Sequence, residues 1–166
     1  MSETNLLKVD PLLDGVQPST TPVSREAMEL AEFIKDRSHS LVDRIESYQD
    51  IISLEIGDTP LTRMRNVERE TGLRQLYIKF EGGNPSGTQK DRIAFAQCLD
   101  AMRRGYDTIS VATCGNFGAA TAQAAFLAGL HCKVFIPETY HTDRISEMES
   151  YGAEVIRFPG SYEDNV

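Results

Sequence analysis

Between residues 76 and 158 the chain alternates short apolar runs with longer segments of helical spacing, which limits the folds that it can adopt. Strands that alternate with helices of about ten or more residues are joined by right-handed crossovers into a mostly parallel sheet. A glycine follows three of the predicted helices, where a left-handed cap is favoured. We therefore predict an α/β fold, with a small parallel-sheet βαβ domain that has helices on both faces. The predicted strands are residues 76–80, 108–112, 132–136 and 154–158, the helices are residues 88–104, 116–129 and 141–151, and the glycines are Gly105, Gly129 and Gly152.

The first 52 residues have a different character. Residues 1–23 look irregular because prolines and a glycine are spaced through a Ser/Thr-rich stretch, and we expect an arm there. Ser24 is predicted to cap a helix whose apolar residues recur at helical spacing. This amphipathic face needs a partner surface, either the core of the chain itself or another domain or subunit. We therefore expect an N-terminal arm and amphipathic helix at 1–52 and a small domain at 53–166.

Three short sequence patterns lie between the N-terminal region and the strand predicted at 76–80. Residues 52–55 are predicted to form a short strand, and the Gly-Asp-Thr-Pro sequence at 57–60 forms a turn. Residues 66–71 are predicted to form a helix that ends at Gly72. The chain then enters the strand at 76–80.

Charge and composition narrow the classes of function. The chain has 17 basic and 25 acidic residues, hence a net charge of −8, whereas nucleic-acid binding requires a clustered basic face. No run approaches the roughly eighteen apolar residues of a membrane span, and the acidic start is unlike a signal peptide. The three cysteines and three histidines are scattered, without the spacing of a disulfide framework or a zinc site. We therefore expect a cytoplasmic protein that binds no nucleic acid, membrane or metal.

Two successive turns contain most of the polar residues that indicate a functional site. In Asn-Pro-Ser-Gly-Thr-Gln-Lys-Asp-Arg, residues 84–92, turn formers precede a helix whose first turn contains Lys90. The turn follows a predicted strand, where sites in α/β proteins usually lie. A lysine at a helix start is ordinarily a solvated charge, and we expect Asp91 and Arg92 only to support the turn. The second turn, Thr-Cys-Gly-Asn-Phe-Gly at 113–118, joins the strand at 108–112 to a helix rich in small residues.

Three motifs in the same order resemble the small domain of the pyridoxal-phosphate enzymes of the tryptophan-synthase β type, also called fold type II. They are NPSGTQKDR at 84–92, TCGNFGAA at 113–120 and YGAEVIRF at 151–158. GDTPL at 57–61 and LYIKFEGGNPSG at 76–87 extend the resemblance, which covers roughly residues 53–166. Within this fold type the chain looks most like the threonine synthases, and cysteine synthases and threonine dehydratases remain alternatives.

The resemblance implies a cofactor, pyridoxal 5′-phosphate, and a role for each matching residue. Lys90 matches the Schiff-base lysine, which binds the cofactor and then moves protons at the substrate α-carbon. A primary amine can condense with an aldehyde, whereas a guanidinium cannot take that role. Asn116 matches the asparagine that hydrogen-bonds the 3′ oxygen of the pyridine ring. The loop that receives the substrate carboxylate is matched by Thr113, Cys114, Gly115, Asn116 and Phe117.

Two positions depart from the pattern of the family. Cys114 stands where most relatives have serine, and a thiol is a weaker donor than a hydroxyl. Near a helix start Cys114 is either a small buried thiol or a reactive one with a lowered pKa. Gln89 stands where threonine synthases usually have an aromatic residue. Both departures bear on which substrate the site accepts.

The Gly-rich loop that binds the cofactor phosphate in this fold type has no counterpart in the sequence, because Gly82 and Gly83 belong to the lysine turn. We therefore expect an N-terminal portion of a larger enzyme, whether a truncated product, part of a split gene or a decayed reading frame. The missing large domain or a second subunit would complete it, and we expect a homo-oligomer.

For the completed enzyme the resemblance implies a lyase that converts O-phosphohomoserine, a small amino-acid substrate, to threonine and phosphate. The isolated chain is expected to be inactive. An alternative within the same chemistry is β-replacement or deamination of a serine- or threonine-like amino acid. An alternative of another class is a non-catalytic small domain that binds a partner chain or regulates an intact paralogue.

Overall fold

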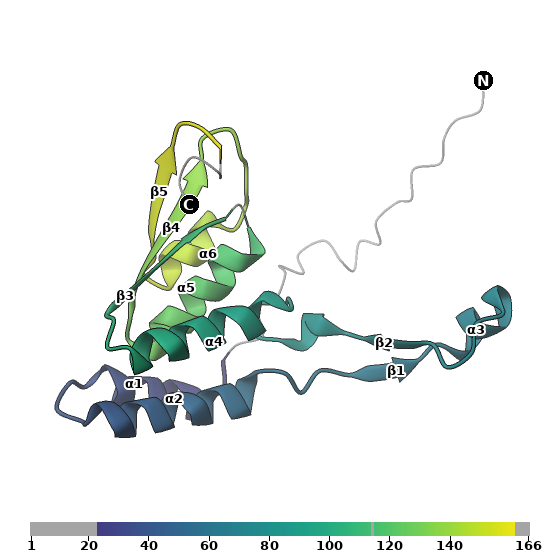
Figure 1. Ribbon diagram of the computed structural model, residues 1–166, viewed down its shortest axis with the longest axis horizontal. Helices are drawn as coiled ribbons and strands as arrows, with labels where there is room; N and C mark the ends of the chain where they lie inside the picture. Colours follow the sequence, from purple (N-terminus) through teal and green to yellow (C-terminus); the bar gives the residue numbers. More distant parts are fainter. Residues whose placement is uncertain (1–22, 114, 162–166) are drawn as a thin grey trace.

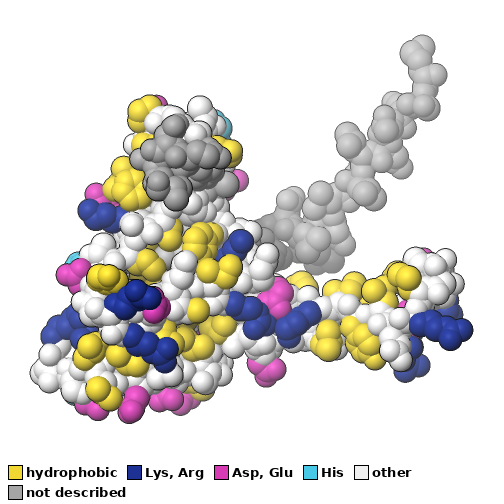
Figure 2. All heavy atoms as spheres, in the orientation of Figure 1, with side chains coloured by type: hydrophobic (Ala, Val, Ile, Leu, Met, Phe, Trp, Pro, Cys, Tyr) yellow, Lys and Arg dark blue, Asp and Glu magenta, His cyan; other side chains and the backbone are white. Residues whose placement is uncertain are grey.

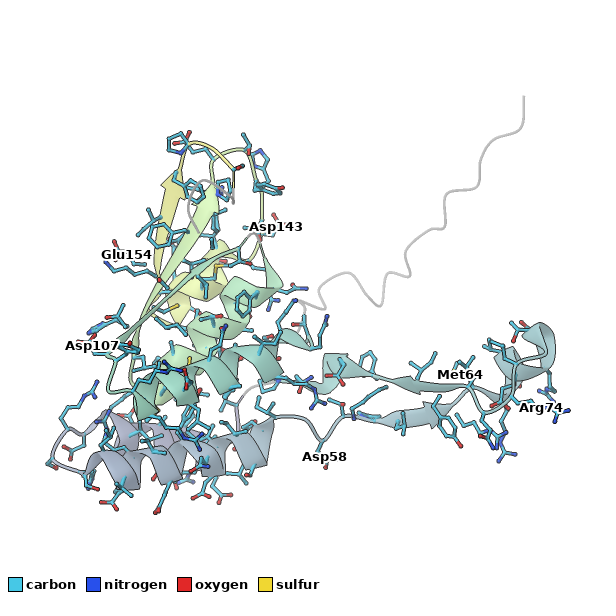
Figure 3. All side chains as sticks on the ribbon, viewed as in Figure 1. Asp58, Met64, Arg74, Asp107, Asp143 and Glu154 are labelled. Carbon is cyan, nitrogen blue, oxygen red and sulfur yellow. The ribbon has the colours of Figure 1, made fainter. Side chains whose placement is uncertain are left out.

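A computed structural model describes residues 23–113 and 115–161 of the chain, and it divides them into a helical and sheet-containing body and a projecting hairpin (Figure 1). Figure 3 places Met64 and Arg74 at the far end of the hairpin and Asp58 near its root. The predicted arm at 1–23 lies outside the described residues except for Val23. The helices are α1 (Arg25–Lys35), α2 (Leu41–Glu55), α3 (Arg65–Thr71), α4 (Lys90–Arg103), α5 (Asn116–Ala128) and α6 (Ile145–Ser150), and the strands are β1 (Leu61–Arg63), β2 (Tyr77–Lys79), β3 (Thr108–Ala112), β4 (His131–Pro137) and β5 (Glu154–Phe158).

The parallel sheet of the body confirms the predicted α/β class. Its strand order is β3-β4-β5, with Val111 beside Val134 and Val134 beside Val155. Glycines in the left-handed region follow α4, α5 and α6, as the sequence predicted: Gly105, Gly129 and Gly152 have φ of 76°, 63° and 77°. The apolar runs at 108–112 and 154–158 coincide with β3 and β5.

One face of this sheet is covered by α5 and α6. Cys132, Val134 and Ile136 of β4 are buried in the core on that face, whereas His131 and Lys133 on the opposite face are exposed. The chain passes from β3 through α5 to β4, and then from β4 through α6 to β5, so both crossovers step across the sheet in the same direction. Crossovers of the same hand that step in the same direction place their helices on the same face of the sheet. The second helical layer that we expected is therefore not formed by the described residues, and an exposed ion pair joins Lys133 to Glu154 on that face at 3.4 Å.

The hairpin corrects the position of one predicted strand. Residues 77–79 do form β2, but β2 pairs antiparallel with β1, with Leu61 opposite Lys79, and has no place in the parallel sheet. The three-residue strand β1 was not predicted, because so short a run carries no periodic signal. At the tip α3 ends at Gly72, which has φ of 73°, as predicted. Apolar side chains remain exposed along the hairpin (Figure 2), namely Leu61, Leu73, Tyr77, Ile78 and Phe80.

The N-terminal helices belong to the hydrophobic core of the body. Ala27, Ala31 and Ile34 of α1 are fully buried, and α1 packs on α2 and α5. The amphipathic face of this helix therefore packs on the core of the chain itself. Residues 52–55 are helical, so the strand predicted there is wrong. Tyr48 and Ile51 are buried in the core, and Ile52 and Ile56 pack against it, so the apolar residues of this run recur at the three- and four-residue spacing of a helix. The boundary expected between residues 52 and 53 therefore falls inside α2.

Small residues let α5 pack closely on its neighbours at the centre of the body. Tyr48 of α2 donates its buried hydroxyl to the carbonyl of Ala124 at 3.1 Å and stacks on Phe95 of α4 with ring centroids 5.9 Å apart.

Of the described cysteines, Cys98 and Cys132 are buried and unpaired, and burial raises their pKa to about 12 and about 11. No helix within the described ranges is both long and apolar enough to cross a bilayer.

Candidate functional site

The turn that precedes Lys90 is fixed from inside by Asn84. Asn84 is fully buried, and its side-chain amide donates to the Glu81 carbonyl at 2.8 Å and accepts from the Gly57 amide at 3.2 Å. Gly87 adopts φ of 80° and donates to the Asn84 carbonyl at 2.8 Å, closing the turn. The main chain then enters α4 at Lys90, whose amide donates to the Thr88 hydroxyl at 3.2 Å. The turn therefore holds Lys90 at the start of a helix, as predicted.

The two residues after Lys90 anchor the turn from opposite sides. Asp91 is fully buried and accepts from the amide and the hydroxyl of Ser86 at 3.1 and 2.9 Å. Burial raises the pKa of Asp91, against the opposing effect of these hydrogen bonds. Arg92 forms two hydrogen bonds with Glu81, at 2.7 and 3.1 Å, and a third with the Gly57 carbonyl at 3.0 Å. Both residues support the turn, as the sequence analysis expected.

Glu81 is the acidic end of this network. Arg92, together with the amide of Asn84 and the hydroxyl of Thr59, lowers the pKa of Glu81 from 4.5 to about 2. Its carboxylate is therefore ionised at neutral pH and neutralises Arg92. The neighbouring charges thus pair with one another and leave the Lys90 amine free of a carboxylate partner within the described residues.

Lys90 differs in this respect from the other described lysines. The ammonium of Lys35 pairs with Glu32 at 2.8 Å, that of Lys79 donates to the Thr59 carbonyl at 2.9 Å, and that of Lys133 pairs with Glu154 at 3.4 Å. The half-buried side chain of Lys90 forms no hydrogen bond or ion pair with another described residue. An amine of this kind is available to an external electrophile.

The second turn joins β3 to α5. Thr113 is buried, and its hydroxyl accepts from the Gly115 amide at 3.5 Å, a long hydrogen bond. Asn116 is exposed and begins α5, and the amides of Asn116 and Phe117 have no acceptor inside the helix, whereas the Gly118 amide donates to the Gly115 carbonyl at 2.9 Å. The Phe117 side chain packs against the hydrophobic core, so its main-chain amide is the group that it offers to a ligand. Cys114 lies outside the described residues.

Arg144 joins the two turns, and sequence reasoning missed it. Its guanidinium donates to the Asn116 side-chain oxygen at 2.8 Å and to the Ser86 carbonyl at 2.9 Å. Glu147 holds the same guanidinium from one turn along α6, with two hydrogen bonds of 2.7 Å. The partners are 28 and 58 residues away in the sequence, so no local pattern could have indicated the contact.

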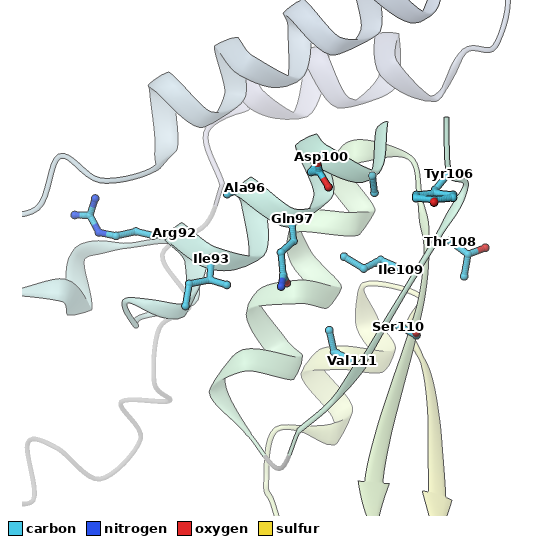
Figure 4. Close-up of a pocket in the computed structure, with 11 residues that line it drawn as sticks. Arg92, Ile93, Ala96, Gln97, Asp100, Tyr106, Thr108, Ile109, Ser110 and Val111 are labelled. Atoms are coloured by element: carbon cyan, nitrogen blue, oxygen red, sulfur yellow. The ribbon is translucent and has the colours of Figure 1, made fainter. Parts of the chain in front are cut away.

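A groove of about 640 Å³ lies between α4 and the free edge of β3. Ile93 and Gln97 of α4 and Ile109 and Val111 of β3 line it, while Arg92 reaches away from the other lining side chains (Figure 4). Neither Lys90 nor Asn116 lines this groove. It offers an apolar surface beside a strand edge, and we place the candidate site at the two turns instead.

Comparison with known proteins decides the family. The family described as pyridoxal-phosphate dependent enzyme matches residues 52–166. The chain belongs to this family. It is 35% identical over 121 residues to a threonine synthase of Methanocaldococcus jannaschii, covering 72% of this chain and 30% of the relative. It is 37% identical over 105 residues to cysteine synthase B of Salmonella typhimurium, covering 61% of this chain and 34% of the relative.

The fold of this pyridoxal-phosphate family is also found by structural comparison. A crystal structure of a pyridoxal 5′-phosphate-dependent aspartate racemase superimposes with a TM-score of 0.62 at 32% identity, covering 72% of this chain and 39% of the other. The chain thus spans about a third of the length of the relatives that it matches. Threonine synthases and cysteine synthases match at similar identity, so the comparisons support the cofactor and leave the substrate class open.

The donor groups at the two turns fit part of this cofactor. An amine without a described partner at Lys90 suits an aldehyde, and the Asn116 side chain, whose oxygen faces Arg144, keeps its NH₂ group for an acceptor such as a ring oxygen. The first-turn amides of α5 suit an anionic group. The described residues fit the aldehyde and ring of pyridoxal phosphate, and they contain no Gly-rich loop for its phosphate.

Proposed function

We propose that this chain supplies the lysine-bearing part of a pyridoxal-phosphate-dependent lyase, with Lys90 as the residue that binds the cofactor covalently. The observation that carries this proposal is the Lys90 amine, which has no partner among the described residues, at a turn that Arg144 ties to the start of α5. Membership of the pyridoxal-phosphate family supports it independently.

Each residue of the site has a role that follows from its chemistry. When bound, the cofactor acts as an electron sink for the substrate α-carbon. Lys90 would hold the cofactor through its primary amine, and the same amine, when not bound to the cofactor, would take up or donate a proton at that carbon. Asn116 orients the ring through its NH₂ donor. The amides of Asn116 and Phe117, aided by the dipole of α5, are proposed to bind the substrate carboxylate together with Thr113, Cys114 and Gly115.

For the complete enzyme we propose the threonine-synthase reaction, in which O-phosphohomoserine loses phosphate and gains water. The match to a threonine synthase over 72% of the chain supports this choice. The similar match to cysteine synthase B keeps β-replacement on a serine-like substrate as the second candidate. Both reactions would use the same lysine and the same carboxylate loop, so the difference lies in side-chain contacts outside the two turns.

We further propose that a second polypeptide segment, either the large domain of the family or another subunit, completes the site. The chain spans about a third of its relatives, and the exposed apolar hairpin and the groove beside β3 are surfaces on which such a segment could pack. A non-catalytic role for this chain as a partner module would use the same surfaces without covalent binding at Lys90. Labelling of Lys90 distinguishes the two.

The test is covalent trapping. The purified chain is incubated with pyridoxal phosphate, reduced with borohydride and mapped by mass spectrometry across its five lysines. We expect Lys90 to carry most of the label and Lys90→Ala to remove it. Lys133→Ala is the matched control, since it removes a lysine whose ammonium is paired with Glu154, and it should leave the labelling of Lys90 unchanged.

Two outcomes would count against the proposal. Even labelling of all lysines, or preferential labelling of Lys133, would show that the turn confers no special reactivity on Lys90. In that case the partner-module function would gain support. If Lys90 is labelled but substrate turns over only after the separately produced remainder of a homologous enzyme is added, the proposed completion of the site is supported as well.

A further inference from the structure

We propose that Arg144 is a positioning residue that fixes the Asn116 side chain with its NH₂ group as the free donor and holds the second turn against the lysine turn. The identity of the acceptor, the ring oxygen of pyridoxal phosphate, rests on the proposed function. The orientation of Asn116 does not, because it follows from contacts within the chain.

The chemistry of the Arg144 guanidinium determines which atom of Asn116 faces it. Arginine has five N–H donors and no acceptor, so the group of Asn116 that faces it must be the carbonyl oxygen. The 2.8 Å contact between Arg144 Nη1 and Asn116 Oδ1 has this polarity. The amide nitrogen of Asn116 is therefore directed to another partner, and it forms no hydrogen bond with another described residue. An asparagine without such a neighbour can turn its amide over and present an acceptor instead.

The guanidinium is itself held firmly. Glu147 accepts from Nε and Nη2 of Arg144 in a paired arrangement, with both distances at 2.7 Å. Both side chains are largely shielded, with side-chain exposures of 22% for Arg144 and 19% for Glu147. Paired hydrogen bonds between arginine and a carboxylate fix the plane of the guanidinium as well as its position. Arg144 therefore approaches Asn116 from a defined direction.

The same guanidinium reaches the lysine turn. Its Nη2 atom donates to the Ser86 carbonyl at 2.9 Å, and the amide and hydroxyl of Ser86 donate to Asp91, the residue that follows Lys90. One side chain, at the residue that precedes α6, thus connects the start of α4 with the start of α5. Arg144 is also the positive charge that opposes the rise in the pKa of buried Asp91. Loss of Arg144 should loosen both turns relative to each other.

The first experiment needs no cofactor. The Asn116 side-chain NH₂ resonances are assigned in the ¹⁵N spectrum of the 166-residue chain by their absence in Asn116→Ala. Arg144→Gln should move them toward the position of a solvated amide. Arg157→Gln is the matched control, because Arg157 donates to the Pro137 and Tyr140 carbonyls, in the segment that leads to Arg144, and forms no hydrogen bond with a described residue of either turn. It should leave these resonances in place, and the proposal is wrong if Arg144→Gln leaves them in place too.

The second experiment measures coupling. The rate of borohydride-trapped labelling at Lys90 is compared among wild type, Arg144→Gln, Asn116→Ala and the double variant. Each single variant should slow labelling about tenfold, the size expected for one charge-assisted hydrogen bond. The double variant should be slower than Asn116→Ala by clearly less than the tenfold effect of Arg144→Gln alone, because Arg144 acts partly through Asn116 and partly through the Ser86 carbonyl. Independent, multiplying effects would overturn the proposed positioning role.

A conservative variant distinguishes the positioning role of Arg144 from a loss of folding. Arg144→Lys keeps the charge but not the planar fork, so it should keep the thermal midpoint near that of the wild type while the NH₂ resonances of Asn116 still shift. Resonances that stay in place in a folded Arg144→Lys would mean that charge alone is sufficient, and this would refute the geometric role. If no variant, wild type included, is labelled at Lys90, the proposed function fails, and the cofactor-free spectra still decide the role of Arg144.

Discussion

At the scale of single residues, the charged side chains around the lysine turn are either paired with an opposite charge or buried and hydrogen-bonded. Arg92 is neutralised by Glu81, and Arg144 is neutralised by Glu147. Asp91 is buried and held by Ser86 without an ion pair within the described residues. This pairing leaves the Lys90 amine without a carboxylate partner in the described part of the chain, which suits the condensation with an aldehyde that we propose for it. The distribution of ion pairs therefore carries more information about the site than the positions of the charges in the sequence do.

The Glu81 carboxylate makes stability depend on pH in a defined direction. Its pKa is about 2 in the folded chain and 4.5 ordinarily, so folding favours the ionised form. Its contribution to the free energy of unfolding is fully present above about pH 4.5 and is lost as the pH falls through about 2. We expect Glu81→Gln to be less stable than wild type at about pH 6, with the difference shrinking toward acid pH, as measured by urea unfolding.

Glu29→Gln is the control for this titration. Glu29 pairs with Arg25 in an exposed i,i+4 arrangement, with side-chain exposures of 66% and 92%, and such pairs contribute little at any pH. A constant difference between wild type and Glu81→Gln from about pH 6 to 2 would contradict the proposed coupling of Glu81 to Arg92.

At the scale of elements, α5 depends on a close approach at Gly118. A β-carbon added to Gly118 would lie 2.8 Å from the Met148 methyl group and 2.9 Å from the Thr113 methyl group. Met148 belongs to α6, and Thr113 belongs to the second turn of the candidate site. The absence of a side chain at Gly118 therefore lets α6, which bears Glu147, approach α5.

Gly118→Val should destabilise the chain through this contact. Overpacking of this kind costs about 1–3 kcal/mol, and the loss should appear in the unfolding midpoint with little change in the denaturant slope. Ala96→Val is the control, since Ala96 is exposed on α4 and the same residue type there should cost only about 0.5 kcal/mol. Helix propensity alone would make Gly118→Val slightly stabilising, because valine is a better helix former than glycine. A Gly118→Val variant that is no less stable than the wild type would therefore contradict the proposed overpacking against Thr113 and Met148.

The elements also show how far the sequence could predict the fold. Continuous apolar runs and terminal glycines identified β3, β5 and the ends of α4, α5 and α6, because those signals are local. Residues 52–55 were misassigned because a short apolar run does not distinguish a strand from a buried helix end. The placement of β2 in the parallel sheet failed because its partner β1 is only three residues long. At the candidate site Lys90 and Asn116 carried motif signals, whereas Arg144 depends on tertiary contacts that no local pattern records.

At the scale of the whole molecule, the hairpin and the body have different bases for stability. The body has one continuous core that includes α1, α2, α4 and α5, with Tyr48 and Phe95 at its centre. The side chains of β1 and β2 are all exposed, and the two strands rely on each other for main-chain hydrogen bonds. An isolated two-stranded hairpin is marginally stable in water. Contacts at its root couple it to the body, among them the ion pair of Arg92 with Glu81 and the hydrogen bond of Arg92 to the Gly57 carbonyl.

This difference should be measurable by hydrogen exchange. We expect amides of β1, β2 and α3 to exchange at least roughly 100-fold faster than those of α5, because local opening of the hairpin exposes no buried core. Arg92→Gln should accelerate exchange further at the hairpin root and leave α5 unchanged. Arg104→Gln, which removes the exposed pair with Asp100 on the same helix, should change neither region. Protection of the hairpin equal to that of α5 would mean that it is stabilised by packing, for example in a homo-oligomer, and exchange measured over a range of concentrations would then show protection that rises with concentration.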